Sequence, residues 1–155
     1  MWRYQRNLNG SNEGLNVTFH LSHVGACTGR DHFSGWSLDW ITLALVYLPY
    51  LHRFHAPCDA RSAFLAIRDA AAHYGGHIIG IPRDNLPVLA DTNGKPLWNA
   101  DSPWEAVTPY RIRGRKKAVL AIGAPAFLAE NIDAADVLIV NGLPFGEGDL
   151  EKYSG

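Results

Sequence analysis

The side chains of this sequence that are most capable of binding or catalysis lie together in one short, glycine-rich segment. Thirteen positions hold two histidines, an arginine, an aspartate and three glycines, namely His23, Gly25, Gly29, Arg30, Asp31, His32 and Gly35. The segment follows an apolar run at residues 15–21 that predicts a strand. Ligands of open α/β sheets bind in loops beyond the carboxyl ends of strands, so we expect a binding site in this loop.

A second loop of the same kind contains Arg83 and follows the apolar run 77–81. Imidazole and carboxylate groups such as those of His23 and Asp31 hydrogen-bond to hydroxyl groups, and a guanidinium binds phosphate in a bidentate fork. Together the two loops could bind a polyhydroxylated, phosphorylated substrate. The alternative is structural: Asp31 caps a turn and Arg83 forms a surface ion pair.

The elements that must position these loops alternate between short apolar runs and amphipathic helical segments. Strands are expected at 15–21, 51–55, 77–81, 118–123 and 136–140, and helices at 37–48 and 60–74, from 125 and from 148. Asp59 is a suitable N-cap for the 60–74 helix, and Gly75 and Gly76 end it. The pattern predicts an α/β fold with a mostly parallel sheet and flanking helices, followed by an incomplete second α/β unit.

Prolines interrupt the periodicity between residues 83 and 114, which predicts a long connection with at most brief structure. The sequence stops as another helix begins, so we expect the segment after about Pro109 to be incomplete or completed by another chain.

Composition excludes several classes of protein. The 155 residues carry a formal net charge of -1, which gives no reason to expect a nucleic-acid partner. Two cysteines, Cys27 and Cys58, are too few for a disulfide scaffold and favour a reduced environment. No apolar stretch approaches the roughly 20 residues of a membrane span, and residues 1–6 lack a secretory signal. We expect a soluble, cytoplasmic protein with no membrane partner.

The seven histidines raise the possibility of a metal site. His52 and His55 lie in a predicted strand, where a spacing of three places them on opposite faces. His73 and His77 are separated by glycines that break the helix between them. We therefore expect no metal site in this chain, and its glycines form neither a dinucleotide-binding motif nor a P-loop.

Five landmarks along the chain resemble a known family. They are Ser22–Gly25, Gly29–Asp31, Leu48–Pro49, Ala56–Ala60 and Ile81–Pro87. Their order and spacing are similar to those of the pyrimidine-binding domain of transketolase-like, thiamine-diphosphate-dependent enzymes. The segment 117–144 is similar to the start of the transketolase C-terminal domain. The resemblance implies a partial pyrimidine-binding domain at 1–108 and the start of a C-terminal-like domain at 109–155.

The resemblance also implies roles for individual residues. His23, Asp31 and Arg83 match family positions that contact the hydroxyl groups and phosphate of a sugar substrate. A further family histidine falls on Gly35, and His32 is the candidate to replace it. We predict these four side chains as substrate-binding residues, with no catalytic residue in the chain itself.

The family's cofactor-binding parts have no counterpart in the sequence. The metal-binding G-D-G…N motif is missing, and the family's activating glutamate would lie upstream of the first residue. The resemblance implies thiamine diphosphate with Mg²⁺ only together with a partner subunit that carries the diphosphate-binding domain and the catalytic glutamate, in an oligomer.

The sequence thus indicates a subunit or fragment of a transketolase-type transferase, which moves a glycolaldehyde or acyl unit. A non-catalytic interaction protein or remnant of this family is the alternative, and an independent small-molecule-binding α/β domain is the third candidate.

Overall fold

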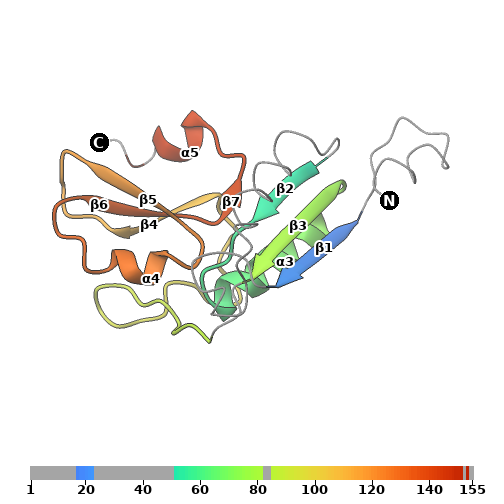
Figure 1. The fold of residues 1–155 in the computed structure, drawn as a ribbon, viewed down its shortest axis with the longest axis horizontal. Coiled ribbons are helices and arrows are strands. Elements are labelled where there is room, and N and C mark those ends of the chain that lie inside the picture. Colours follow the sequence, from blue (N-terminus) through green and yellow to red (C-terminus); the bar gives the residue numbers. More distant parts are fainter. Residues whose placement is uncertain (1–16, 23–50, 82–84, 152, 154–155) are drawn as a thin grey trace, which may run out of the picture.

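The computed structural model describes residues 17–22, 51–81, 85–151 and 153 (Figure 1). It contains two small sheets and three helices in this part of the chain. In chain order the elements are β1 (Thr18–Ser22), β2 (Leu51–His55), α3 (Ala60–Ala72), β3 (Gly76–Ile81), β4 (Val107–Arg111), β5 (Ala118–Ile122), α4 (Ala126–Ala129), β6 (Asp136–Val140), β7 (Gly142–Leu143) and α5 (Glu147–Glu151).

The first sheet has the order β1-β3-β2-β7. Strands β1, β3 and β2 are parallel, and β7 joins the edge in the antiparallel direction. Strand β3 is central and almost entirely buried, because its apolar run can face packed layers on both sides. The parallel arrangement predicted for these strands is confirmed.

Helix α3 covers one face of this sheet, where Ala66 and Ala70 pack against Ile79. The helix begins at a capping box: the Asp59 side chain accepts the N–H of Ser62 at 2.8 Å, and the Ser62 hydroxyl contacts the Asp59 backbone N–H at 3.0 Å. The cap predicted from the sequence is confirmed.

The second sheet has the order β4-β6-β5, with β5 parallel and β4 antiparallel to the central β6. Strand β4 lies in the segment expected to be a connection. It contains Pro109, which has no N–H to donate, and it is tolerated because β4 is an edge strand with a register shift between Pro109 and Arg111. Strand β4 spans the boundary predicted between residues 108 and 109, and the division into domains stays a prediction.

One apolar cluster joins the two sheets. Phe54 and Ile78, from β2 and β3, share it with Val107 and Val140, from β4 and β6. Figure 1 shows the two sheets as neighbouring halves, with β7 between them. A mixed α/β fold with a second small α/β unit, β5-α4-β6, is therefore what the sequence predicted.

Two other expectations can be compared with this part of the chain. The helix expected at 37–48 lies outside the described residues. Among the helices that are described, none is long and apolar enough to cross a membrane.

Candidate functional site

The four predicted substrate-binding residues, His23, Asp31, His32 and Arg83, lie outside the described residues. The strands that precede their loops are described. The last residue of β1, Ser22, is the register partner of Ile81, the last residue of β3. The chain segments that carry these four residues therefore start from adjacent points at the carboxyl edge of the first sheet, as the prediction of a shared site requires.

The third strand end at this edge leads to Asp59, which has a structural task. One carboxylate oxygen accepts the Ser62 N–H at 2.8 Å, and the other accepts the N–H of Leu89 at 2.9 Å. The side chain is buried. Asp59 therefore holds the start of α3 and the segment around Leu89 and is not available to hold thiamine diphosphate or its metal ion.

The neighbouring Cys58 is also committed to the fold. It is fully buried, and its Sγ lies 3.6 Å from the Ser62 hydroxyl. Burial raises the pKa of the thiol to about 12. A thiol that stays protonated in this way is a poor nucleophile and a poor metal ligand.

A cluster of imidazoles forms where β2, β3 and α3 meet. His55 Nε2 lies 3.2 Å from His77 Nδ1 and 3.7 Å from Asp69 Oδ2. All three residues are buried, and both histidines have no exposed surface. The same Asp69 oxygen is 2.6 Å from Arg53 Nη1, and the Arg53 guanidinium lies 3.9 Å from the centre of the Trp104 ring.

Two more histidines border this cluster. The ring of His52 stacks on that of His73 at 5.3 Å and lies 5.1 Å from the ring of His77. A register shift in β2 makes this possible, because Leu51 pairs with Gly76 while Arg53 pairs with His77. His52 is exposed and His55 is buried, but both rings pack against His77, at 5.1 Å and 5.5 Å, so the prediction that their spacing places them on opposite faces is wrong. The glycines after α3 end the helix but do not keep His73 and His77 apart.

Burial determines the charge of the cluster. It lowers the pKa of His55 to about 3, and it also lowers the pKa of His77 and of His52. At neutral pH these imidazoles are therefore neutral, and each offers one ring nitrogen with a free electron pair. The single-letter sequence offers no sign of this cluster beyond the number of histidines, because the residues come from three separate elements.

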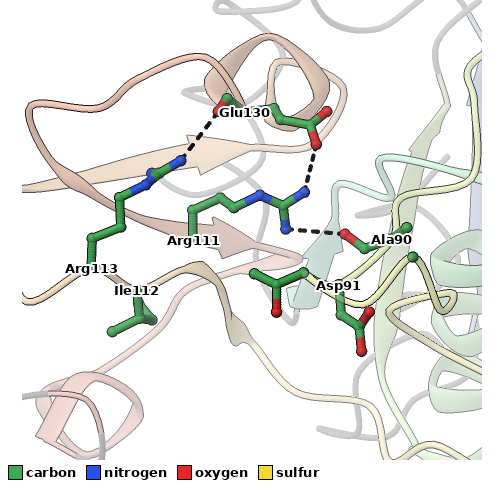
Figure 2. A pocket seen from close by; sticks show the side chains of 8 residues that line it. Ala90, Asp91, Arg111, Ile112, Arg113 and Glu130 are labelled. Atoms are coloured by element: carbon green, nitrogen blue, oxygen red, sulfur yellow. Dashed lines mark hydrogen bonds and ion pairs between the residues drawn. The ribbon is translucent and has the colours of Figure 1, made fainter.

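A pocket of about 500 Å³ lies elsewhere, between the segment around Asp91 and the α4 region (Figure 2). Figure 2 shows that Arg111 bridges the Ala90 carbonyl oxygen, at 3.0 Å, and the Glu130 carboxylate, at 2.6 Å. Arg113 donates to the carbonyl oxygen of Ile132 at 3.0 Å. Both guanidinium groups are already paired within the protein, so this pocket is a weaker candidate for binding an anion.

No protein-family model matches this sequence, and no curated protein sequence matches it significantly. Several solved structures are similar to this chain. The chain is similar to a transketolase variant from Pichia stipitis, with a TM-score of 0.66 and 17% identity over 88% of this chain and 21% of that one. The same values hold for a transketolase from Pichia stipitis in complex with sedoheptulose-7-phosphate.

A further similar structure is a split-gene transketolase described as an inactive β4 tetramer. Its TM-score is 0.53 and its identity 23%, over 81% of this chain and 39% of that one. The chain spans about a fifth of the length of the Pichia stipitis enzymes. From these likenesses we conclude that the chain has a transketolase-like fold, which corresponds to one part of a transketolase.

Proposed function

We propose that this chain is a subunit or fragment of a thiamine-diphosphate-dependent, transketolase-type transferase, and that it contributes substrate-binding loops to a site completed by another chain. The observation that carries the proposal is the partial match: the structural alignment covers 88% of this chain but only 21% of the similar transketolase. A chain with that share of the fold needs the remaining parts to be supplied if it is to act as an enzyme.

The strand ends support the proposed role of the loops. Ser22 and Ile81 are register partners, so the two loops that carry His23 and Arg83 leave the sheet from neighbouring positions. In the proposed site the imidazole of His23 and the carboxylate of Asp31 bind substrate hydroxyls, and Arg83 binds the phosphate. Their contribution is to orient the substrate, and His32 takes the place of the imidazole that the family has at Gly35.

The cofactor belongs to the partner in this proposal. Thiamine diphosphate, when bound, supplies the group-transfer chemistry that amino-acid side chains lack. Asp59 is engaged in capping and anchoring, so we assign it no role in holding the diphosphate or Mg²⁺.

An uncovered apolar strip supports the need for a partner. Leu120 and Ile122, on one face of the edge strand β5, are 41% and 38% exposed. Their register partners, Leu138 and Val140, belong to the apolar cluster between the sheets. The strip thus extends that cluster to the surface, as expected of a face that another chain or domain covers.

Reconstitution tests the proposal. The chain is mixed with a candidate partner that carries the G-D-G…N motif, and thiamine-dependent transfer of a glycolaldehyde unit from a ketose phosphate is measured. Arg83→Ala should weaken binding of the phosphorylated substrate by about 10- to 150-fold. This is the equivalent of about 1.5–3 kcal/mol, the range for a hydrogen bond to a charged group. Arg115→Ala, an exposed arginine on the second unit, is the matched control and should leave the KM unchanged.

Two results would overturn this function. One is turnover that does not respond to Arg83→Ala, which would remove the substrate role. The other is tight binding of thiamine diphosphate by the isolated chain.

A non-catalytic assembly is the second candidate, and one comparison favours it. The similar split-gene transketolase is described as an inactive β4 tetramer, so a protein with this fold can assemble without activity. If this chain is such a protein, no partner will create turnover, but light scattering will still show a defined oligomer. An active mixture would exclude this candidate.

A further inference from the structure

The buried cluster of His55, Asp69 and His77 has the features of a metal site. One ligand atom from each residue lies within 4.8 Å of the other two. The residues come from β2, α3 and β3, so a shared ligand would join the helix directly to the sheet.

The hydrogen bond of His77 fixes which of its nitrogens is free. Its Nε2 lies 3.1 Å from the backbone carbonyl oxygen of His73. A carbonyl oxygen can only accept, so Nε2 carries the hydrogen atom and Nδ1 keeps its electron pair. Metal-binding histidines are typically held in this way, with the second nitrogen donating to a carbonyl or carboxylate. The free Nδ1 faces His55.

The spacing of the nitrogens suits a small metal ion. Ligands bound to Zn²⁺ at about 2.0–2.1 Å in tetrahedral geometry lie about 3.3–3.5 Å from one another. The observed separations are 3.2 Å from His55 Nε2 to His77 Nδ1 and 3.7 Å from His55 Nε2 to Asp69 Oδ2. Two of the three ligand edges therefore lie within about 0.2 Å of the tetrahedral range, and all three ligand atoms lie within 4.8 Å of one another.

Hydrogen bonding alone leaves this cluster incomplete. If His55 donates from Nε2 to His77, its Nδ1 is a buried acceptor, and that atom has no partner among the described residues. If the hydrogen is instead on Nδ1, the two facing nitrogens of His55 and His77 both present electron pairs. In that second arrangement a cation between the two nitrogens would accept both electron pairs, while His55 Nδ1–H would stay without a partner among the described residues.

We propose that His55 Nε2, His77 Nδ1 and the Asp69 carboxylate bind a divalent transition-metal ion of the Zn²⁺ type, with a fourth position left for water or an exchangeable ligand. Two imidazoles and one carboxylate are a common protein set for such ions. The exposed His52 and the half-exposed His73, stacked beside His77, mark the side from which an ion enters. The proposal does not depend on the transferase function, and either can fail without the other.

Arg53 is the competitor for this site. Its guanidinium is 2.6 Å from Asp69 Oδ2 and places a positive charge where the ion would be coordinated. It also lies against the Trp104 ring, which offers it a position that does not require the carboxylate. Loading therefore requires Arg53 to give up part of its contact with Asp69, and removing its charge should tighten metal binding.

The test uses the whole chain, stripped with a chelator and titrated with Zn²⁺ by calorimetry and with Co²⁺ by absorption. We expect one ion per chain, a Co²⁺ spectrum typical of four-coordinate nitrogen and oxygen ligands, and a higher midpoint of thermal unfolding in the presence of Zn²⁺. His55→Gln, His77→Gln and Asp69→Asn should each weaken binding at least tenfold, and Arg53→Met should tighten it about tenfold.

Controls separate the buried site from surface binding. His20→Gln alters an exposed histidine of β1 and should leave affinity unchanged. The double variant His52→Gln/His73→Gln at the rim removes the His73 contact with Asp69 Oδ1 at 3.2 Å and should weaken binding less than the core variants do. The absence of a one-to-one complex in the unaltered chain would overturn the proposal, as would loss of binding only in the rim variant. If a core variant does not fold, the Co²⁺ spectrum of the unaltered chain and the direction of the Arg53→Met effect still decide the matter.

Discussion

Asp59 is a buried side chain whose removal should disturb the contact between the start of α3 and the segment around Leu89. It caps α3 through Ser62 and, with its other oxygen, holds the N–H of Leu89. Asp59→Ala would remove both acceptors and leave two buried N–H groups without partners. The Ser62 hydroxyl would remain to contact the backbone around residue 58.

The expected loss of stability follows from these two contacts. Loss of an N-cap costs about 0.5–2 kcal/mol, and loss of a hydrogen bond to a charged group about 1.5–3 kcal/mol. Because neighbouring contacts are not additive, we expect a total of about 2–4 kcal/mol for Asp59→Ala. At about 2 kcal/mol per molar urea, this lowers the unfolding midpoint by about 1–2 M.

Urea unfolding followed by far-ultraviolet circular dichroism measures this shift. Asp59→Asn keeps an oxygen for the cap but loses the charge, so its midpoint should lie between those of the unaltered chain and Asp59→Ala. Asp101→Ala removes an exposed carboxylate from a turn and is the matched control, with an expected change within about 0.5 kcal/mol. An Asp59→Ala midpoint equal to that of Asp101→Ala would refute the reasoning.

Three further predictions test other parts of the molecule. With Cys27 replaced by serine, Cys58 should react with Ellman's reagent about a thousandfold more slowly than a thiol of ordinary pKa, because its pKa rises from 9.0 to about 12. Reaction at the rate of a free thiol in the folded chain would contradict this prediction. Gly142→Ala should cost about 1–3 kcal/mol of unfolding free energy, since the added Cβ would lie 2.7 Å from Trp104 Cζ2, whereas Gly146→Ala meets nothing within 4 Å and should be nearly neutral. Backbone N–H donors hold the pKa of Asp136 below 3.8, so this carboxylate stabilises the fold at neutral pH and loses its effect as the pH falls through the lowered value. Asp136→Asn should therefore flatten the acid-induced loss of stability. An unchanged profile of unfolding free energy against pH would exclude this role.

The elements that the sequence predicted are those whose local signals agree with their packing. The apolar run of β6, at 136–140, is buried almost throughout, and its predicted bounds are the observed ones. Asp59 was predictable as a cap because a short acidic side chain before a periodic apolar segment has few other uses. The helix that follows ends within two residues of the expected position, before Gly75, whose φ of 124° suits glycine.

Other features were not predictable because they depend on contacts distant in the sequence. Strand β4 contains Pro109, and only its place at a sheet edge makes that residue acceptable. The two-residue β7 exists because it pairs with Phe54 and His55 of β2. The histidine cluster depends on a register shift at His52 that no spacing rule reveals.

The two candidate sites use different positions along the first sheet. His77 is the second residue of β3, and Ile81, from which the Arg83 loop leaves, is its last; four residue steps of strand separate them by about 13 Å. His55, the last residue of β2, pairs with Ile79, so the proposed metal ligands of the two strands lie between the amino end and the middle of β3. The proposed metal ligands and the proposed substrate-binding residues are different residues. A bound metal ion would act on the loops by fixing α3 and β2 to β3. In a reconstituted enzyme, Asp69→Asn should consequently lower thermal stability while leaving the KM for the phosphorylated substrate nearly unchanged. Arg83→Ala should raise that KM while leaving thermal stability nearly unchanged. A large rise in the KM of the Asp69→Asn enzyme at a temperature where it is folded would show that the two ends of the strand are coupled.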